Sequence, residues 1–114
     1  MKVIIAGSRT IKDYSLVCEA ITESGFEIDL VVSGHAKGVD QLGERWAKEH
    51  GVPVEQHPAQ WNAHGIAAGP IRNEAMAQAA DALVAIMPEE GTKGTKDMIR
   101  RAKKHGLKVH ILYV

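Results

Sequence analysis

Glycine and hydroxyl side chains gather in three short segments whose composition suits phosphate binding. The segments are Gly7-Ser8-Arg9-Thr10, Ser33-Gly34-His35-Ala36-Lys37-Gly38 and Gly91-Thr92-Lys93-Gly94-Thr95. Glycine lets the backbone approach an anion closely, and Ser and Thr hydroxyls donate hydrogen bonds to it. Each segment alone is also typical of an ordinary strand-to-helix turn, so the prediction of an anion site depends on all three converging.

A second group of candidates lies in the stretch from Gln60 to Asn73. Trp61 and His64 could stack on a base or hydrogen-bond a sugar, and Trp61 could equally close over the sheet edge as a lid. Arg72 and Asn73 fall in the first turn of a predicted helix, where a guanidinium and an amide can reach the same anion. We therefore predict Trp61, Arg72 and Asn73 as ligand-binding residues.

Five short apolar runs have the length of β-strands and must position these segments. They cover residues 2–6, 28–33, 53–57, 82–87 and 108–114. Three of them are nearly continuous hydrophobic runs, as in parallel strands that are covered on both faces. The alternation with helical patterns predicts a doubly wound, mainly parallel sheet, in the order 3-2-1-4-5 by analogy with such folds. All three Gly-rich segments would then share the carboxyl edge, where helix N-termini favour anions.

Four stretches of helical periodicity separate the strands. The first runs from Tyr14 to a stop at Gly25, and the second covers residues 38–50. The third begins after Gly69 with Pro70 in a first position, and we expect its inward residues to be Ile71, Met76, Ala79 and Ala80. The last runs from about Thr95 to His105. Its expected inward residues are Met98, Ile99 and Ala102, and its expected outward residues are Arg100, Arg101, Lys103 and Lys104.

The composition bounds the class of protein. At 114 residues, with 45% hydrophobic and 25% charged residues, the chain should form one globular domain over residues 1–114. Acidic and basic residues balance, so no overall positive field favours nucleic acid or anionic lipid. The apolar run before Gly7 is too short for a signal peptide or a membrane span, and we expect a cytoplasmic protein.

The sequence lacks the residue patterns of several common kinds of binding site. Cys18 is the one cysteine and the histidines show no paired ligand spacing, so we predict no metal site and no cofactor. Neither the Walker A pattern nor GxGxxG is present. The second strand ends in Ser33 where a standard NAD-dependent dehydrogenase would have an acidic residue.

Four motifs taken together resemble a known family. The segments AGSRT, SGHAKGVDQLGERWA, W..HG.AAGPIRNEAM and GTKGTKDMIRRA are similar to the YspA-type branch of the SLOG superfamily, over nearly the whole chain. The resemblance implies a Rossmann-like three-layer sandwich. The superfamily includes the LOG phosphoribohydrolases, which release a base from a nucleoside 5'-monophosphate, and the DprA DNA-processing proteins. The segment SGHAKGVD of this chain also resembles the Gly-rich motif of DprA.

The resemblance implies a nucleotide-type ligand and assigns residues to three motifs. These are Gly34, Lys37, Gly38 and Asp40, then Arg72 and Asn73, then Gly91, Thr92, Gly94 and Thr95. The chain departs from LOG enzymes in the last motif, because Met98 stands where their PGGxGTxxE pattern has the catalytic Glu. Asp97 is one residue earlier, so its side chain would leave a helix about 100° away.

Three functions follow as hypotheses. The first is binding or sensing of a nucleotide or nucleotide-derived small molecule. The second is a LOG-like N-glycosidase in which Arg72 orients the phosphate and Asp97 or Glu90 stabilises an oxocarbenium-like transition state. The third, single-stranded DNA binding as in DprA, is disfavoured because aromatic residues are few and the net charge is zero. The Ala-rich third helix and the LOG relatives also suggest a homodimer.

Overall fold

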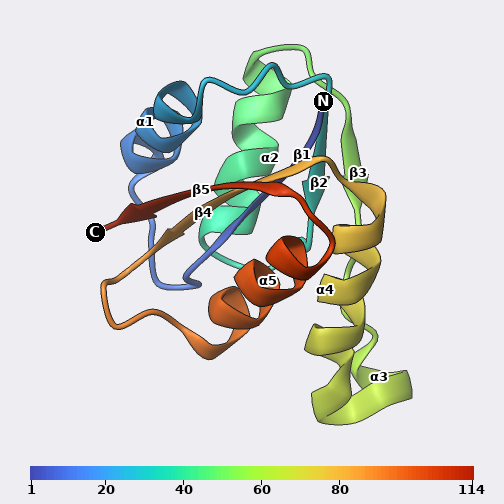
Figure 1. Cartoon of the computed structure of the whole chain (residues 1–114). Helices are drawn as coiled ribbons and strands as arrows, with labels where there is room; N and C mark the ends of the chain where they lie inside the picture. Colours follow the sequence, from blue (N-terminus) through green and yellow to red (C-terminus); the bar gives the residue numbers. More distant parts are fainter.

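The computed structural model describes residues 1–114 as a five-stranded sheet covered by helices on both faces (Figure 1). The strands are β1 (Lys2–Gly7), β2 (Leu30–Ser33), β3 (Val54–Gln56), β4 (Ala82–Met87) and β5 (Lys108–Tyr113). All pairings are parallel and the order is β3-β2-β1-β4-β5. The Rossmann-like three-layer sandwich and its predicted strand order are thereby confirmed.

The helices divide between the two faces of the sheet. They are α1 (Tyr14–Ser24), α2 (Val39–Glu49), α3 (Trp61–His64), the 3-10 helix η1 (Gly65–Ala67), α4 (Ala68–Ala79) and α5 (Lys93–Lys104). Helices α1 and α2 cover one face and α4 and α5 the other (Figure 1). Each face therefore has its own hydrophobic core, one around Val3, Ile5 and Val17 and the other around Ile4, Met76 and Met98.

Local sequence explains where these elements begin and end. All six residues of β4 are buried, as a central strand covered on both faces requires. Asp13 caps α1 by accepting a hydrogen bond from the Ser15 amide at 3.0 Å, and Gly25 ends the helix in the left-handed conformation at φ 68°. The predicted first helix and its stop at Gly25 are thus confirmed.

The third predicted helix differs from the sequence-based expectation. Helix α4 begins at Ala68, before Pro70, and two short helical turns, α3 and η1, precede it. Its buried residues are Ala68, Asn73, Met76 and Ala77, whereas Ile71 is exposed and Ala79 and Ala80 are only partly buried. The prediction is confirmed for Met76 and wrong for Ile71, and the buried face instead includes a polar residue, Asn73, because hydrogen bonds satisfy its amide there.

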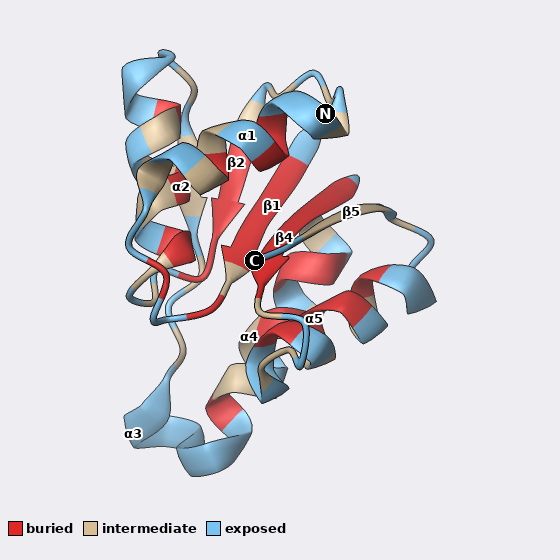
Figure 2. Cartoon of the chain, turned by 90° about the vertical axis from the view of Figure 1, so that its left-hand side faces the viewer, coloured by how far each residue is buried: buried red, intermediate tan, exposed pale blue.

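The two short turns before α4, α3 and η1, project from the body of the protein and are exposed along their length (Figure 2). Trp61 is 50% exposed and Ile66 is 95% exposed. No helix in the chain combines the length and the apolar composition that a membrane-spanning segment needs.

Candidate functional site

The larger of two adjoining cavities lies at the carboxyl edge of the sheet, outside the ends of β1 and β4. At this point the chain winds toward β2 on one side and toward β5 on the other, which is where open α/β sheets bind their ligands. A cavity of about 510 Å³ opens there, within the usual range for small-molecule sites. We call it the main cavity. Its lining includes Gly7, Ser8, Arg9, Thr10, Asp40, Trp61, Arg72, Asn73, Thr92, Gly94, Thr95 and Asp97.

The first two Gly-rich segments pack tightly against each other. Gly38 has a φ of +79°, and a Cβ there would lie 2.7 Å from the backbone of Arg9. A Cβ on Gly7 would collide with the Ile86 carbonyl and with Val39, and one on Gly34 would lie 2.7 Å from Asp40 Oδ2. These three glycines thus leave room for neighbouring protein atoms. Gly94 is different, because an added Cβ would meet no atom within 4 Å.

The loop after β1 holds its hydroxyl groups in place. The Ser8 amide donates to the Ile86 carbonyl at 3.1 Å, which ties the loop to β4. The Ser8 and Thr10 hydroxyls share a hydrogen bond at 2.8 Å, and Ser8 is buried. The loop therefore presents these hydroxyls to the cavity in a fixed arrangement.

Arg72 lies at the centre of the edge and has no carboxylate partner within ion-pair distance. Its Nη1 donates to the Gly34 carbonyl at 2.7 Å, and its Nε donates to Asn73 Oδ1 at 3.0 Å. Burial lowers the pKa of this guanidinium, although the nearby Asp40 charge raises it. Arg72 is therefore oriented by neutral acceptors, which leave its charge available to an anion.

Asp40 is the buried carboxyl group of the site, with 6% of its surface exposed. Burial raises its pKa from 3.8 to about 6, against the opposing effects of the Ala36 amide and the Arg72 charge. The Ala36 amide donates to Asp40 Oδ2 at 3.2 Å. Asp40 thus holds the loop at Ala36, and its pKa lies closer to neutral pH than that of an exposed carboxyl group.

Helix α5 points its N-terminus into the main cavity without a side-chain cap. The Thr92 hydroxyl donates to the Thr95 hydroxyl at 2.7 Å instead of capping a backbone amide. The first-turn amides and the positive end of the helix dipole therefore remain available to a negatively charged group.

The predicted catalytic carboxylates occupy different environments. Asp97 lines the main cavity and accepts hydrogen bonds from Asn73 Nδ2 at 3.0 Å and from Arg101 Nε at 2.9 Å. Although partial burial raises its pKa, these bonds and one from Arg100 together lower it below its ordinary value. Glu90 is exposed and lines neither cavity, whereas Met98 is buried against the main cavity.

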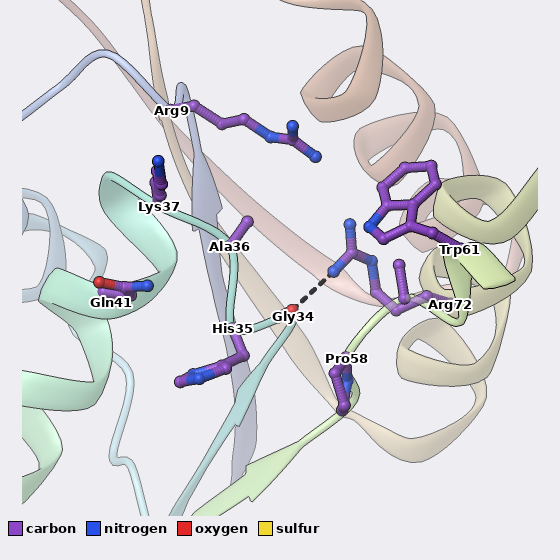
Figure 3. Close-up of a pocket in the computed structure, with 10 residues that line it drawn as sticks. Arg9, Gly34, His35, Ala36, Lys37, Gln41, Pro58, Trp61 and Arg72 are labelled. Atoms are coloured by element: carbon purple, nitrogen blue, oxygen red, sulfur yellow. Dashed lines mark hydrogen bonds between the residues drawn. The ribbon is translucent and has the colours of Figure 1, made fainter. Parts of the chain in front are cut away.

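A second cavity of about 410 Å³ adjoins the first (Figure 3). We call it the side cavity. The two cavities share Arg9, Ala36, Trp61 and Arg72. Of the predicted residues, Gly34 and Lys37 line only the side cavity, and Ser33, Gly38 and Gly91 line neither cavity.

Sequence reasoning missed His35, Gln41, Pro58 and Ala59, which also line the side cavity. His35 Nδ1 lies 2.9 Å from Glu44 Oε2, and the Ser33 hydroxyl donates to the same oxygen at 2.7 Å. His35 is also the single non-glycine residue with a positive φ, at 58°. A histidine within a Gly-rich turn was the available signal, but its contact with a glutamate nine residues later follows no local pattern.

No group of three or more His, Cys, Asp or Glu side chains in the chain is arranged to hold a metal ion. Lys93 also lines the main cavity, which therefore holds three basic side chains, with Arg9 and Arg72, beside the carboxyl groups of Asp40 and Asp97. The side cavity holds the basic side chains of Arg9, Lys37 and Arg72.

Comparison with known proteins identifies relatives. Residues 1–64 match the family described as YspA, cpYpsA-related SLOG. The Gene 61 protein of Mycobacterium phage D29 is 35% identical over 117 residues, covering 95% of this chain and 93% of that protein. DNA processing protein A (DprA) from Streptococcus pneumoniae has a similar structure, with a TM-score of 0.73 and 20% identity. The match covers 95% of this chain but 48% of DprA, so the chain spans about half of that protein and shares its fold.

Proposed function

The chain belongs to the YspA, cpYpsA-related SLOG family, and we propose that its main cavity binds the phosphate of a nucleotide or nucleotide-derived small molecule. One observation carries the proposal. The uncapped N-terminus of α5 and the guanidinium of Arg72, which has no carboxylate partner, face the same cavity.

Charge balance supports a phosphate as the bound group. The chain has 14 basic and 14 acidic residues, so its cations have enough carboxylates to pair with. Arg9 and Arg72 nevertheless form no ion pair, and both line the main cavity. An anion that enters would gain two charge-assisted contacts without first breaking a salt bridge.

The apolar part of the same cavity supports a nucleoside attached to that phosphate. The cavity is lined by hydroxyl and glycine residues and also by Trp61, Ile66, Pro70, Met76 and Met98. The Arg9 guanidinium lies 5.9 Å from the centre of the Trp61 ring, so the indole can shift to stack on a base while keeping a cation beside it. Stacking and lid roles for Trp61 are compatible in this arrangement.

The test is calorimetric titration of the protein with AMP, GMP, CMP and UMP, together with adenosine as a ligand that lacks phosphate. We expect at least one monophosphate to bind, its nucleoside to bind at least about tenfold more weakly, and Arg72→Ala to abolish the difference. Arg45→Ala is the matched control, because Arg45 pairs with Glu49 on the surface of α2 and lies outside both cavities. Equal binding of nucleotide and nucleoside, or no binding of either, would reject the proposal.

A second candidate is the LOG-like N-glycosidase, favoured by one observation. Asp97 lines the cavity and is held ionised, as a carboxylate that stabilises an oxocarbenium ion must be. Both of its oxygens already accept hydrogen bonds, from Asn73 and the two arginines, which opposes this role. Chromatography for free base after incubation with each monophosphate decides the question, and release that persists in Asp97→Asn would remove Asp97 from the mechanism.

Single-stranded DNA is a third candidate, because the structural neighbour DprA is a DNA processing protein. Binding of an oligonucleotide through several phosphates would weaken steeply with added salt, whereas a mononucleotide site would respond weakly.

The same preparation can be examined by sedimentation with and without ligand, which tests the predicted homodimer.

A further inference from the structure

The solvent side of α5 carries a continuous row of positive charge. Residues 93–108 contain seven of the chain's 14 basic residues and a single acidic residue, Asp97. The buried residues of the helix are Thr95, Met98, Ile99 and Ala102. Spacings of three and four residues place the exposed basic side chains together on the opposite side, over a length of about 16 Å. We call them the basic face, and they are Lys93, Lys96, Arg100, Lys103 and Lys104.

Negative charge gathers on α1 and in the loop that follows it. Residues 13–29 contain five acidic residues and no lysine or arginine. All five are exposed, and we call them the acidic face, which consists of Asp13, Glu19, Glu23, Glu27 and Asp29. The distance along the helix from residue 13 to residue 23 is about 15 Å. The acidic face therefore matches the basic face in length and in number of charges.

Few of these charges are neutralised within the chain. In the basic face, Arg100 alone forms an ion pair, with Asp97 at 2.6 Å. In the acidic face, Asp29 pairs with the amino group of Met1, and Glu23 lies 3.6 Å from His110 Nε2. The four lysines and the other three carboxylates have no oppositely charged group within ion-pair distance. Each face can therefore accept a partner of opposite charge without losing an existing network.

The two faces cannot meet within one molecule, because the sheet lies between α1 and α5 (Figure 1). The protein measures 34 × 27 × 25 Å, whereas charges in water are screened within about 8 Å at physiological ionic strength. Since the faces point in opposite directions, they cannot both lie in one interface. A contact between the basic face of one copy and the acidic face of another is therefore heterologous, and it leaves one face of each copy free for the next.

We propose that the basic face of α5 binds the acidic face of a second copy of this chain, so that copies join head to tail. Charge complementarity favours a second copy over nucleic acid, because the chain has no net charge to attract a polyanion and its acidic face repels one. The exposed large apolar side chains all lie outside both faces, so the contact is polar and sensitive to salt. The proposal does not depend on the proposed function, since only Lys93 among these residues also lines a cavity.

Sedimentation equilibrium of the protein over a range of concentrations tests the proposal. At about 20 mM sodium chloride, we expect the weight-average mass to rise with concentration beyond that of two chains, because a head-to-tail contact does not stop at a dimer. At about 300 mM, the association constant should be lower by at least about tenfold, because the contact is screened. A mass that is independent of salt would overturn the proposal.

Two variants locate the contact by charge reversal at exposed positions. Lys96→Glu with Lys103→Glu disrupts the basic face, and Glu19→Lys with Glu23→Lys disrupts the acidic face. Each variant alone should associate at least about tenfold more weakly than the wild type at low salt, because like charges then oppose each other. An equal mixture should form a one-to-one complex and nothing larger, since each variant retains one working face. Wild-type association by either variant would contradict the proposal.

A control separates the two faces from net charge. Lys2→Glu with Lys48→Glu, at exposed positions outside both faces, changes the net charge as much as the basic-face variant does, and it should associate as the wild type does. If this control loses association equally, net charge governs the mass and the proposal is wrong. If the wild type does not self-associate but binds an oligonucleotide duplex through Lys96 and Lys103, the partner of α5 is nucleic acid and the proposal is again wrong.

Discussion

Two clusters of charged side chains lie on either side of Asn73 and are organised in opposite ways. On the outer side, between α4 and α5, Arg101 pairs with Glu74 at 3.0 Å and with Asp97 at 2.9 Å, and His105 lies 2.6 Å from Glu74. On the inner side, Arg9, Lys37 and Arg72 have no carboxylate within ion-pair distance. Asn73 joins the clusters, because its Oδ1 accepts from Arg72 and its Nδ2 donates to Asp97.

The pKa values of the carboxyl groups also differ between the two clusters. Hydrogen bonds from His105 and Arg101 lower the pKa of Glu74 to about 2, whereas burial raises the pKa of Asp40 to about 6. The outer cluster is internally neutralised and holds two helices together. The inner cluster has cations that form no ion pair, although the Asp40 charge acts on Arg72 and Arg9 from a greater distance. This difference separates a stabilising network from a candidate binding site.

The largest expected effect is on ligand affinity. Arg72→Ala should weaken binding of the proposed nucleotide between about 100-fold and 1,000-fold, or about 3 to 4 kcal/mol, because a partly buried charged contact is lost. Calorimetry of the variant and of Arg72→Lys, which keeps the charge, separates charge from geometry. Arg101→Ala should change affinity by less than about twofold, and an equal loss in both Ala variants would erase the contrast between the clusters.

The next effect concerns Asp40 and pH. Its pKa is 3.8 ordinarily and about 6 in the folded protein, so both states largely hold the proton below about pH 3. Between about pH 3 and pH 6 the unfolded state releases its proton first, and the wild type loses stability as pH rises. The free energy of unfolding of Asp40→Asn, relative to wild type, should therefore increase by about 3 kcal/mol from about pH 3 to about pH 7. Urea denaturation at four pH values measures this, and a flat difference would show that Asp40 titrates normally.

A smaller effect is expected in the outer cluster. Arg101 is a bridge between α4 and α5, and 22% of its side chain is exposed. Arg101→Ala should lower the free energy of unfolding by about 1 to 1.5 kcal/mol, because two hydrogen bonds to two carboxylates are lost from a partly exposed site. Arg45→Ala, which removes an exposed pair on α2, should cost less than about 0.5 kcal/mol. Denaturant unfolding compares the two, and equal losses would contradict a structural role for the outer cluster.

The smallest expected effect is at Gly94, where one substitution should raise the stability of the protein and weaken its binding of a nucleotide. Gly94 lies in the first turn of α5 with open space around it, so Gly94→Ala should stabilise the protein by about 0.5 to 1 kcal/mol. The added methyl group enters the main cavity and should weaken nucleotide binding. Thermal unfolding and calorimetry on the same sample test both. A stabilised variant with unchanged affinity would place the phosphate away from the α5 N-terminus.

Much of the fold could be predicted from sequence because it depends on local patterns. The parallel sheet followed from the alternation of apolar runs with helices, its strand order followed by analogy with doubly wound folds, and the stop of α1 followed from Gly25. The start of α4 could not be predicted, since Pro70 fits a first helical turn and nothing local indicates the turns before it. The inward rotation of Asn73 depends on partners 21 and 24 residues away, Gly94 and Asp97.

Some features of the candidate site could likewise be predicted from the sequence, and others could not. The Gly-rich segments could be assigned to one edge because the carboxyl ends of parallel strands share it. The roles of the individual glycines could not, since Gly34 and Gly38 make room for Asp40 and the Arg9 backbone, residues that local sequence does not place beside them. Likewise, Arg101 was expected to face solvent, and its pairing with Glu74 depends on how α4 packs against α5.

By itself, the sequence determined the layered α/β architecture with parallel strands and the edge at which glycine, hydroxyl and basic residues meet. These features depend on hydrophobic periodicity and turn chemistry, which act over a few residues. Only the tertiary structure decided which cations are neutralised and which are not, and whether a glycine faces protein or open space. Those properties depend on distances between segments far apart in the chain, and hydrogen bonds and charge pairs act only when such segments come within a few ångströms of one another.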